Sequence, residues 1–136
     1  MLVVDSSVIV EVFATIDPPP RLIDRLAADG DLHAPQLIDV EVLAVLRRMT
    51  LHETIDIRHA EAVRADLASL ALARYAHQPL SDRIWELRPN LTAYDATFVA
   101  LAELLQAPLV TCDARLASAP GHDARIELFE VASCKT

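Results

Sequence analysis

Short segments that read as strands alternate along this chain with longer amphipathic segments, and this alternation constrains the fold most. Strands are expected at five places: Met1–Val4, Leu32–Ala34, Tyr75–Gln78, Leu109–Thr111 and Ile126–Val131. Short apolar runs such as LVV before Asp5 are typical of strands buried on both faces. Strands separated by helices favour a parallel sheet covered on both sides. The sequence therefore predicts an α/β fold.

Helices are expected in the segments between these strands. The first follows Asp5 and extends to Val12, a short one begins at Ala114, and the others are Arg21–Ala28, Gln36–Leu51, His59–Ala73, Ser81–Leu87 and Thr92–Gln106. Ser81 is expected to cap its helix, and His52–Ile57 to form a loop. No repeat or linker divides the sequence, so residues 1–136 are predicted to form a single domain.

The composition excludes several classes of protein. Hydrophobic residues make up 53% of the chain, enough for a core without disulfides or a structural metal. Cys112 and Cys134 lack the spacing of a zinc or redox motif, which favours two reduced thiols. The apolar N-terminus carries Asp5 and Glu11 without a leading positive charge. We therefore expect neither a signal peptide nor a membrane span, and predict a cytoplasmic protein.

The net charge, taken alone, argues against a nucleic acid partner. The formal net charge is −8, and phosphate backbones are held mainly by lysine and arginine. Eleven of the twelve basic residues are arginine, however, which suits bidentate contact with phosphate better than lysine does. Clustered acids could also be offset by a cation or by a basic protein.

Two aspartates follow predicted strands directly. Asp5 comes after LVV, and Asp113 comes two residues after LVT. The carboxyl ends of parallel strands meet at one edge of a sheet, where ligands bind. Each aspartate alone is explained as well by a helix cap. Two such aspartates at the same sheet edge favour a shared site.

Two further acids lie in predicted helices. At about 100° per residue, Glu41 falls within the apolar arc of its helix, between Leu37 and Val45. A purely structural role is also possible for Glu41, namely a salt bridge to an arginine such as Arg48. Asp95 lies in the first turn of a largely apolar helix, where a capping box would explain an acid equally well.

If these four acids meet, a divalent cation would remove the repulsion between them. Mg²⁺, or alternatively Mn²⁺, prefers oxygen ligands, and the five scattered histidines offer no competing site for a softer metal. Such an ion can stabilise displacement at a phosphodiester. Ser6 and Thr111 lie beside the strand-end acids and could donate hydrogen bonds to a carboxylate or phosphate.

The chain resembles a known family over nearly its whole length. The segments VVDSSVIVE, PQLIDVEVLAVLRR and LTAYDATFVALAELLQAPLVTCDARL, in this order, are similar to those of PIN domains, especially of VapC-type toxins of bacterial toxin–antitoxin pairs. The resemblance implies a three-layer sandwich with a five-stranded parallel sheet of order 3-2-1-4-5. It also implies a Mg²⁺-dependent ribonuclease, a homodimer, and a VapB-type antitoxin that wraps a groove between helices and blocks the acidic site.

The resemblance assigns residues to this activity. Asp5, Glu41, Asp95 and Asp113 match the metal-binding catalytic acids, while Ser6 and Thr111 match polar residues beside them. RNA contact is expected of local arginines, for which the candidates are Arg115, Arg47 and Arg48.

Two other interpretations are possible from the sequence. The chain could be a binding module that kept the fold and lost catalysis, which its acidic charge would suit. It could also be a phosphatase or a receiver-like phosphoacceptor with strand-end aspartates. Such proteins need a supporting lysine, and Lys135 is the only lysine here. This last interpretation is therefore the weakest.

Overall fold

The computed structural model describes residues 1–131, which form a five-stranded parallel sheet. The strands lie in the order β3-β2-β1-β4-β5, and every neighbouring pair is parallel. Their bounds are β1 Leu2–Val4, β2 Leu32–Pro35, β3 Leu72–Tyr75, β4 Leu109–Thr111 and β5 Ile126–Leu128. The predicted fold class and strand order are confirmed.

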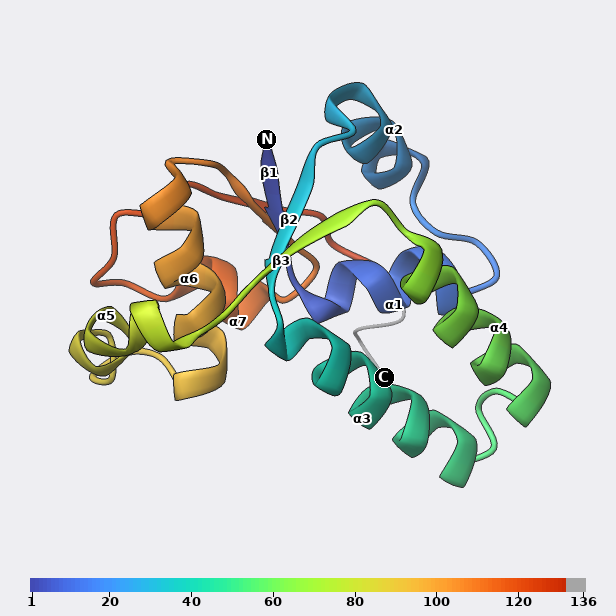
Figure 1. The fold of residues 1–136 in the computed structure, drawn as a ribbon. Helices are drawn as coiled ribbons and strands as arrows, with labels where there is room; N and C mark the ends of the chain where they lie inside the picture. Colours follow the sequence, from blue (N-terminus) through green and yellow to red (C-terminus); the bar gives the residue numbers. More distant parts are fainter. Residues whose placement is uncertain (132–136) are drawn as a thin grey trace.

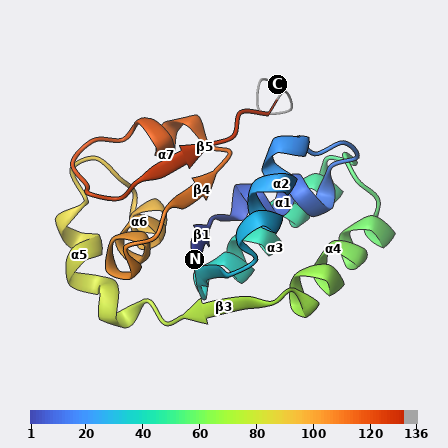
Figure 2. The ribbon, with the colours of Figure 1, turned by 90° about the horizontal axis from the view of Figure 1, so that it is seen from above.

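Helices cover both faces of the sheet. They are α1 Ser6–Ala14, α2 Pro20–Asp29, α3 Leu37–Leu51, α4 Ile57–Ser69, α5 Ser81–Glu86, α6 Ala93–Leu105 and α7 Ala114–Ser118, with a 3-10 turn, η1, at Gln78–Leu80. Figure 1 shows α3 and α4 on the opposite side of the strands from α5 and α6. In Figure 2, α1 to α4 lie to one side of the sheet and α5 and α6 to the other. The result is a three-layer sandwich.

The core lies around β1, the central strand. Leu2, Val3 and Val4 are completely buried, as is expected of a strand with helices on both sides. Helix α6 contributes a run of seven buried residues, from Ala96 to Ala102. Apolar residues on nearly all sides are typical of a helix buried in the core. Helix α6 contacts β1, β2 and β4, and Asp95 lies in its first turn.

The boundary between α4 and β3 differs from the prediction. The helix expected to reach Ala73 ends at Ser69, and the strand expected at Tyr75–Gln78 is Leu72–Tyr75. Leucine and alanine around residue 71 favour helix locally. Residues 72–75 instead pair with residues 32–35 of β2, so tertiary hydrogen bonding overrides the local preference.

Other predicted boundaries were also wrong. Ser81 does not cap α5, because η1 runs directly into that helix and Ser81 is its first residue, with helical dihedral angles. Strand β5 ends at Leu128 rather than Val131. Cys134 and Lys135 lie outside the described residues. Among residues 1–131, no helix has the length and apolarity that a membrane span requires.

Candidate active site

Four acids approach the carboxyl edge of the sheet from four different segments. Asp5 follows β1 and Asp113 follows β4, and these two strands are neighbours in the sheet. Glu41 lies in the second turn of α3, which follows β2, and Asp95 lies in the first turn of α6. The chain therefore brings together residues separated by up to 108 positions.

Asp5 is held in one orientation by three hydrogen bonds. Its Oδ1 accepts from the Ser7 hydroxyl at 2.6 Å and from the Val8 amide at 3.3 Å, while its Oδ2 accepts from the Thr111 hydroxyl at 2.6 Å. Asp5 is thus the N-cap of α1, the structural role that the sequence left open. Burial raises the pKa of Asp5 to about 6, although the three hydrogen bonds lower it and the charge of Asp113 raises it further.

Glu41 is partly buried and accepts a hydrogen bond from the Ser6 hydroxyl at 3.1 Å. Desolvation raises the pKa of Glu41, the bond from Ser6 lowers it, and the charges of Asp95 and Asp5 raise it. None of the ion pairs formed within residues 1–131 includes Glu41, so its predicted alternative partner, Arg48, does not neutralise it.

Asp95 takes part in the N-terminal cap of α6 and is also close enough to Asp113 to be affected by its charge. Its amide donates to the Thr92 hydroxyl at 3.1 Å, and Thr92 is the N-cap of α6. Desolvation raises the pKa of the Asp95 carboxyl and the charge of Asp113 raises it further, while Arg115 and Thr92 lower it. A cap at this position therefore does not exclude a carboxylate that faces other acids.

Asp113 caps the short helix α7. Its Oδ1 accepts from the Arg115 amide at 2.9 Å, and its amide donates to the Thr111 hydroxyl at 3.0 Å. The Arg115 guanidinium lies 3.7 Å from Asp113 Oδ2, but its side chain is 86% exposed. Thr111 thus links the two strand-end aspartates through a single hydroxyl group.

Ser7 is part of the site, and the sequence analysis did not identify it. Its hydroxyl donates to Asp5, accepts from the Cys112 amide at 2.9 Å, and lies 3.4 Å from the Thr111 hydroxyl. It joins the loop after β4 to the cap of α1. Two adjacent serines after a strand-end aspartate were a signal that both hydroxyls, and not Ser6 alone, could serve the site.

The charges of neighbouring acids raise the pKa of three of the four carboxyls, which indicates that the four acids lie near one another. The charge of Asp113 raises the pKa of Asp5 and of Asp95, and the charges of Asp95 and Asp5 raise the pKa of Glu41. Within residues 1–131, no three Asp, Glu, His or Cys side chains are already arranged as ligands of one ion. The donor set nevertheless fits a hard divalent cation, since it offers carboxylate oxygens whose mutual repulsion such a cation would relieve.

The arginines predicted to contact RNA differ in how near they lie to these acids. Arg115 is beside Asp113. Arg47 and Arg48 are exposed on α3, six and seven residues beyond Glu41, which is about 9–11 Å along a helix. Their contact with RNA stays a prediction.

Comparison with known proteins places this geometry in a family. The model of the PIN domain matches residues 2–121 of the chain. This chain belongs to the PIN domain family. It is 38% identical to Ribonuclease VapC12 of Mycobacterium tuberculosis, over 94% of this chain and 98% of that protein. It is 40% identical to Ribonuclease VapC1 of the same organism, over 93% of this chain and 96% of that one.

A solved structure shares the fold of this PIN domain. It is VapBC2 from Rickettsia felis bound to a DNA fragment from their promoter, with a TM-score of 0.68 and 14% sequence identity. The match covers 93% of this chain and 97% of that chain. At this identity the likeness supports the fold, and the acids must be judged from their own geometry.

Proposed function

We propose that this PIN domain is a metal-dependent ribonuclease that cleaves RNA phosphodiester bonds and acts as the toxin of a VapBC-type toxin–antitoxin pair. The observation that carries the proposal is the set of hydrogen bonds that links the acids at the carboxyl edge of the sheet: Thr111 joins Asp5 to Asp113, and Glu41 accepts from Ser6 beside Asp5. Asp95 lies near enough for the charge of Asp113 to raise its pKa. The identity of 38–40% to two proteins named as VapC ribonucleases supports it over nearly the full length of the chain.

Asp5, Glu41, Asp95 and Asp113 are the residues that would hold Mg²⁺, and the same oxygen donors suit Mn²⁺. A divalent ion supplies positive charge that stabilises displacement at a phosphodiester. Positive charge is also what this acidic edge needs before a polyanion can approach it.

The surrounding hydroxyl groups position these carboxylates. Ser7 and Thr111 fix the two oxygens of Asp5, and Ser6 fixes one oxygen of Glu41. Because Thr111 also accepts from the Asp113 amide, the loop after β4 cannot shift without disturbing Asp5. We propose that these bonds preorganise the site, so that little reorganisation is needed when substrate binds.

The direct test is RNA cleavage by the purified protein with Mg²⁺ and with EDTA. Asp5→Asn and Asp95→Asn are expected to lower the Mg²⁺-dependent rate at least 100-fold, while the exposed control Asp66→Asn on α4 keeps wild-type activity. Equal cleavage by all four proteins would point to a contaminating nuclease and remove support for the proposal.

Calorimetry separates this function from that of an inactive binding module. An active enzyme is expected to bind Mg²⁺ through the four acids. Tight binding of a basic peptide, together with no binding of divalent ions and no cleavage, would favour the binding module instead.

The partners of the proposed toxin are an antitoxin and a second copy of the chain. A net charge of −8 suits an antitoxin segment that supplies arginine or lysine to the acidic edge. When the wild type is expressed alone in the cytoplasm of bacterial cells, we expect growth to stop, whereas expression of Asp95→Asn should leave growth unchanged. Coexpression of the protein encoded by the neighbouring open reading frame is expected to relieve the growth arrest, which tests for an antitoxin. Sedimentation equilibrium measures the mass of the protein in solution and tests for the homodimer.

A further inference from the structure

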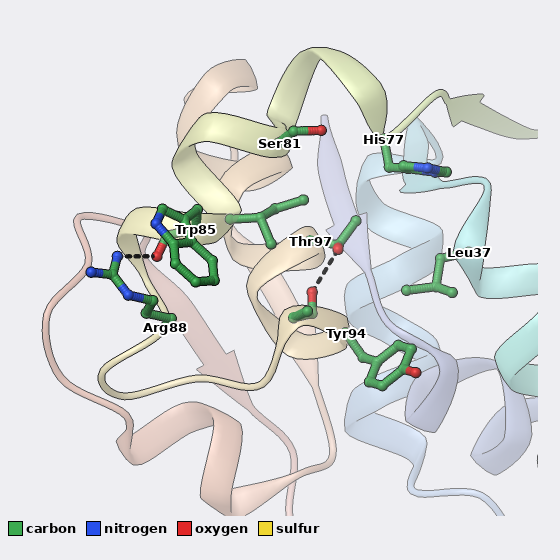
Figure 3. Close-up of a pocket in the computed structure, with 9 residues that line it drawn as sticks. Leu37, His77, Ser81, Trp85, Arg88, Tyr94 and Thr97 are labelled. Atoms are coloured by element: carbon green, nitrogen blue, oxygen red, sulfur yellow. Dashed lines mark hydrogen bonds between the residues drawn. The ribbon is translucent and has the colours of Figure 1, made fainter.

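An open groove of about 580 Å³ lies between the N-terminal end of α3 and the helices α5 and α6. Leu37, Ile84 and Thr97 contribute to its lining, together with the larger side chains of Trp85, Arg88 and Tyr94. Figure 3 shows Trp85 and Arg88 on one side of the groove and Tyr94 and Leu37 on the other. The volume is in the range of small-ligand sites.

The groove is lined by residues that lie close in the chain to two of the four acids. Tyr94 lines it and directly precedes Asp95 in the first turn of α6. Leu37 lines it and lies one helical turn before Glu41, on the same face of α3. Asp95 and Glu41 are therefore carried by the same turns of α6 and α3 as residues that line the groove or by the turn next to them, so an RNA segment in the groove would pass near these two acids.

The groove presents exposed aromatic rings rather than a closed apolar core. Trp85 is 67% exposed and Tyr94 is 63% exposed. The Arg88 guanidinium lies 4.4 Å from the centre of the Trp85 ring and donates to the Trp85 carbonyl oxygen at 2.8 Å. No ion pair among residues 1–131 includes Arg88.

We propose that this groove binds an unpaired nucleobase of the RNA substrate, next to the phosphate that is cleaved. The inference rests on the proposed ribonuclease function and adds a structural requirement for the substrate. Trp85 and Tyr94 supply faces for stacking, and Arg88 supplies a planar cation beside them. A base inside a duplex is stacked and paired, so only a single-stranded or looped region can enter.

The charge of the protein supports this mode of binding. With a net charge of −8, the chain cannot gain most of its affinity by neutralising phosphates. Stacking does not depend on net charge and is tolerant of sequence. A second copy of the chain would also cover the apolar surface of the groove, so the oligomeric state of the Trp85 variant distinguishes the two occupants.

Trp85 is the only tryptophan of the chain, so its fluorescence reports on the groove directly. The probe is a mixed-sequence single-stranded RNA octamer, added with Ca²⁺ in place of Mg²⁺, so that a divalent cation offsets the charge of the acidic edge while its looser coordination disfavours cleavage. We expect the octamer to quench Trp85 emission, and an abasic octamer or a blunt RNA duplex of the same length to leave it unchanged. Quenching by the abasic octamer, or none by any RNA, would overturn the inference.

Variants test whether the rings bind the base or merely support the fold. Tyr94→Ala and Trp85→Ala are expected to weaken binding of a labelled octamer about 5- to 100-fold, the range that loss of base stacking gives. Tyr94→Phe keeps the ring and should bind like the wild type. Leu104→Ala is the matched control, because Leu104 is 64% exposed on the same helix, ten residues from Tyr94. Equal loss in Leu104→Ala would overturn the inference.

The salt dependence and the oligomeric state complete the test. If only Arg88 and Arg115 contact phosphates, log K should fall with log salt with a slope of about −1.4. A slope steeper than about −4 would indicate phosphate neutralisation instead of stacking. Trp85 emission that changes with protein concentration alone, with a dimer lost in Trp85→Ala, would assign the groove to a second copy and overturn the inference.

Failure of this inference and failure of the proposed function give different results. Cleavage without base-dependent quenching would leave a ribonuclease that lacks this subsite. Base-dependent quenching without cleavage under any metal would support the subsite and contradict the enzyme.

Discussion

At the scale of single residues, Asp5 shows how one side chain serves both fold and site. It caps α1 and accepts three hydrogen bonds, yet burial raises the pKa of its carboxyl to about 6. At neutral pH the protein therefore keeps a buried negative charge that is less stable in the folded state than in the unfolded chain. Such a cost is typical of residues retained for activity.

Replacing Asp5 is expected to stabilise the metal-free protein while abolishing cleavage. The pKa of Asp5 is raised in the folded state, so the free energy of unfolding falls as pH rises from about 4 to 6. Asp5→Asn removes this dependence and should raise the free energy of unfolding by about 1–3 kcal/mol at pH 7.5, and by less at pH 4.5. Urea unfolding in EDTA measures both values. A larger gain at pH 4.5 than at pH 7.5 would contradict the assignment.

Thr111→Val tests the hydroxyl that links Asp5 and Asp113. The change keeps the shape of a completely buried side chain but leaves the Asp113 amide without its acceptor and Asp5 without a donor. We expect a loss of about 1–3 kcal/mol in stability and an upward shift of the acid limb of the cleavage pH profile, since the pKa of Asp5 rises further. Thr50→Val is the control, because the Thr50 hydroxyl donates to the Arg47 carbonyl oxygen within α3 and lines no part of the groove. An unshifted profile in Thr111→Val would contradict the link.

At the scale of elements, long-range partners decided where segments end and how helices meet. Residues 72–75 became β3 because β2 offers them a parallel ladder, and Arg74 in that strand forms a bidentate pair with Asp39 of α3. On the other side of the sheet, Arg83 of α5 forms a bidentate pair with Glu103 of α6, which also accepts from the Asp123 amide. The second pair holds together the two helices that form most of the groove.

Arg83→Met is expected to loosen α5 from α6. It leaves the partly buried Glu103 without its guanidinium partner, at a cost of about 1–2 kcal/mol. The pKa of Glu103 is lowered in the folded state, chiefly by the bonds from Arg83, so this contribution is present at neutral pH and is lost as pH falls below about 4.5.

The measurement is thermal unfolding at pH 7 and at pH 3.5. Arg64→Met is the control, since it breaks an exposed pair with Glu61 worth less than about 0.5 kcal/mol. A cost for Arg83→Met that does not shrink at pH 3.5 would show that the pair is not its origin.

At the scale of the whole molecule, the site exists only when the sheet and both helix layers are assembled. The acids come from two strand ends and two helices on opposite sides of the sheet. An ion that binds all of them would bind the folded chain and not the unfolded one. Folding and metal binding are therefore expected to be linked.

Mg²⁺ is expected to raise the unfolding midpoint of the wild type. At an ion concentration 100 times its Kd, the stabilisation would be about 2.7 kcal/mol. Asp113→Asn should lose most of this shift, while Asp66→Asn should keep it. Scanning calorimetry in Mg²⁺ and in EDTA at matched ionic strength measures the difference, and a single transition would support one domain over residues 1–136. An equal shift in all variants would show that the ion acts elsewhere.

The sequence by itself determined the alternation of strands and helices and the positions of Asp5 and Asp113 after buried strands. These features are local, because a continuous apolar run and the acid that ends it lie within a few residues of each other. The resemblance to PIN domains, carried by three segments, supplied the strand order. The angular position of Glu41 on its helix also indicated an acid turned toward the interior.

Only the tertiary structure decided which partners these residues have. It paired Glu41 with Ser6 instead of Arg48, brought Ser7 to Asp5 and Thr111, ended α4 before residue 72, and placed Trp85 opposite Tyr94 across a groove. Most of these contacts join segments that are distant in the sequence. The local conformational preference of one segment carries no information about its partner. The choice of partner depends on how helices pack against the sheet, which no short window of sequence contains.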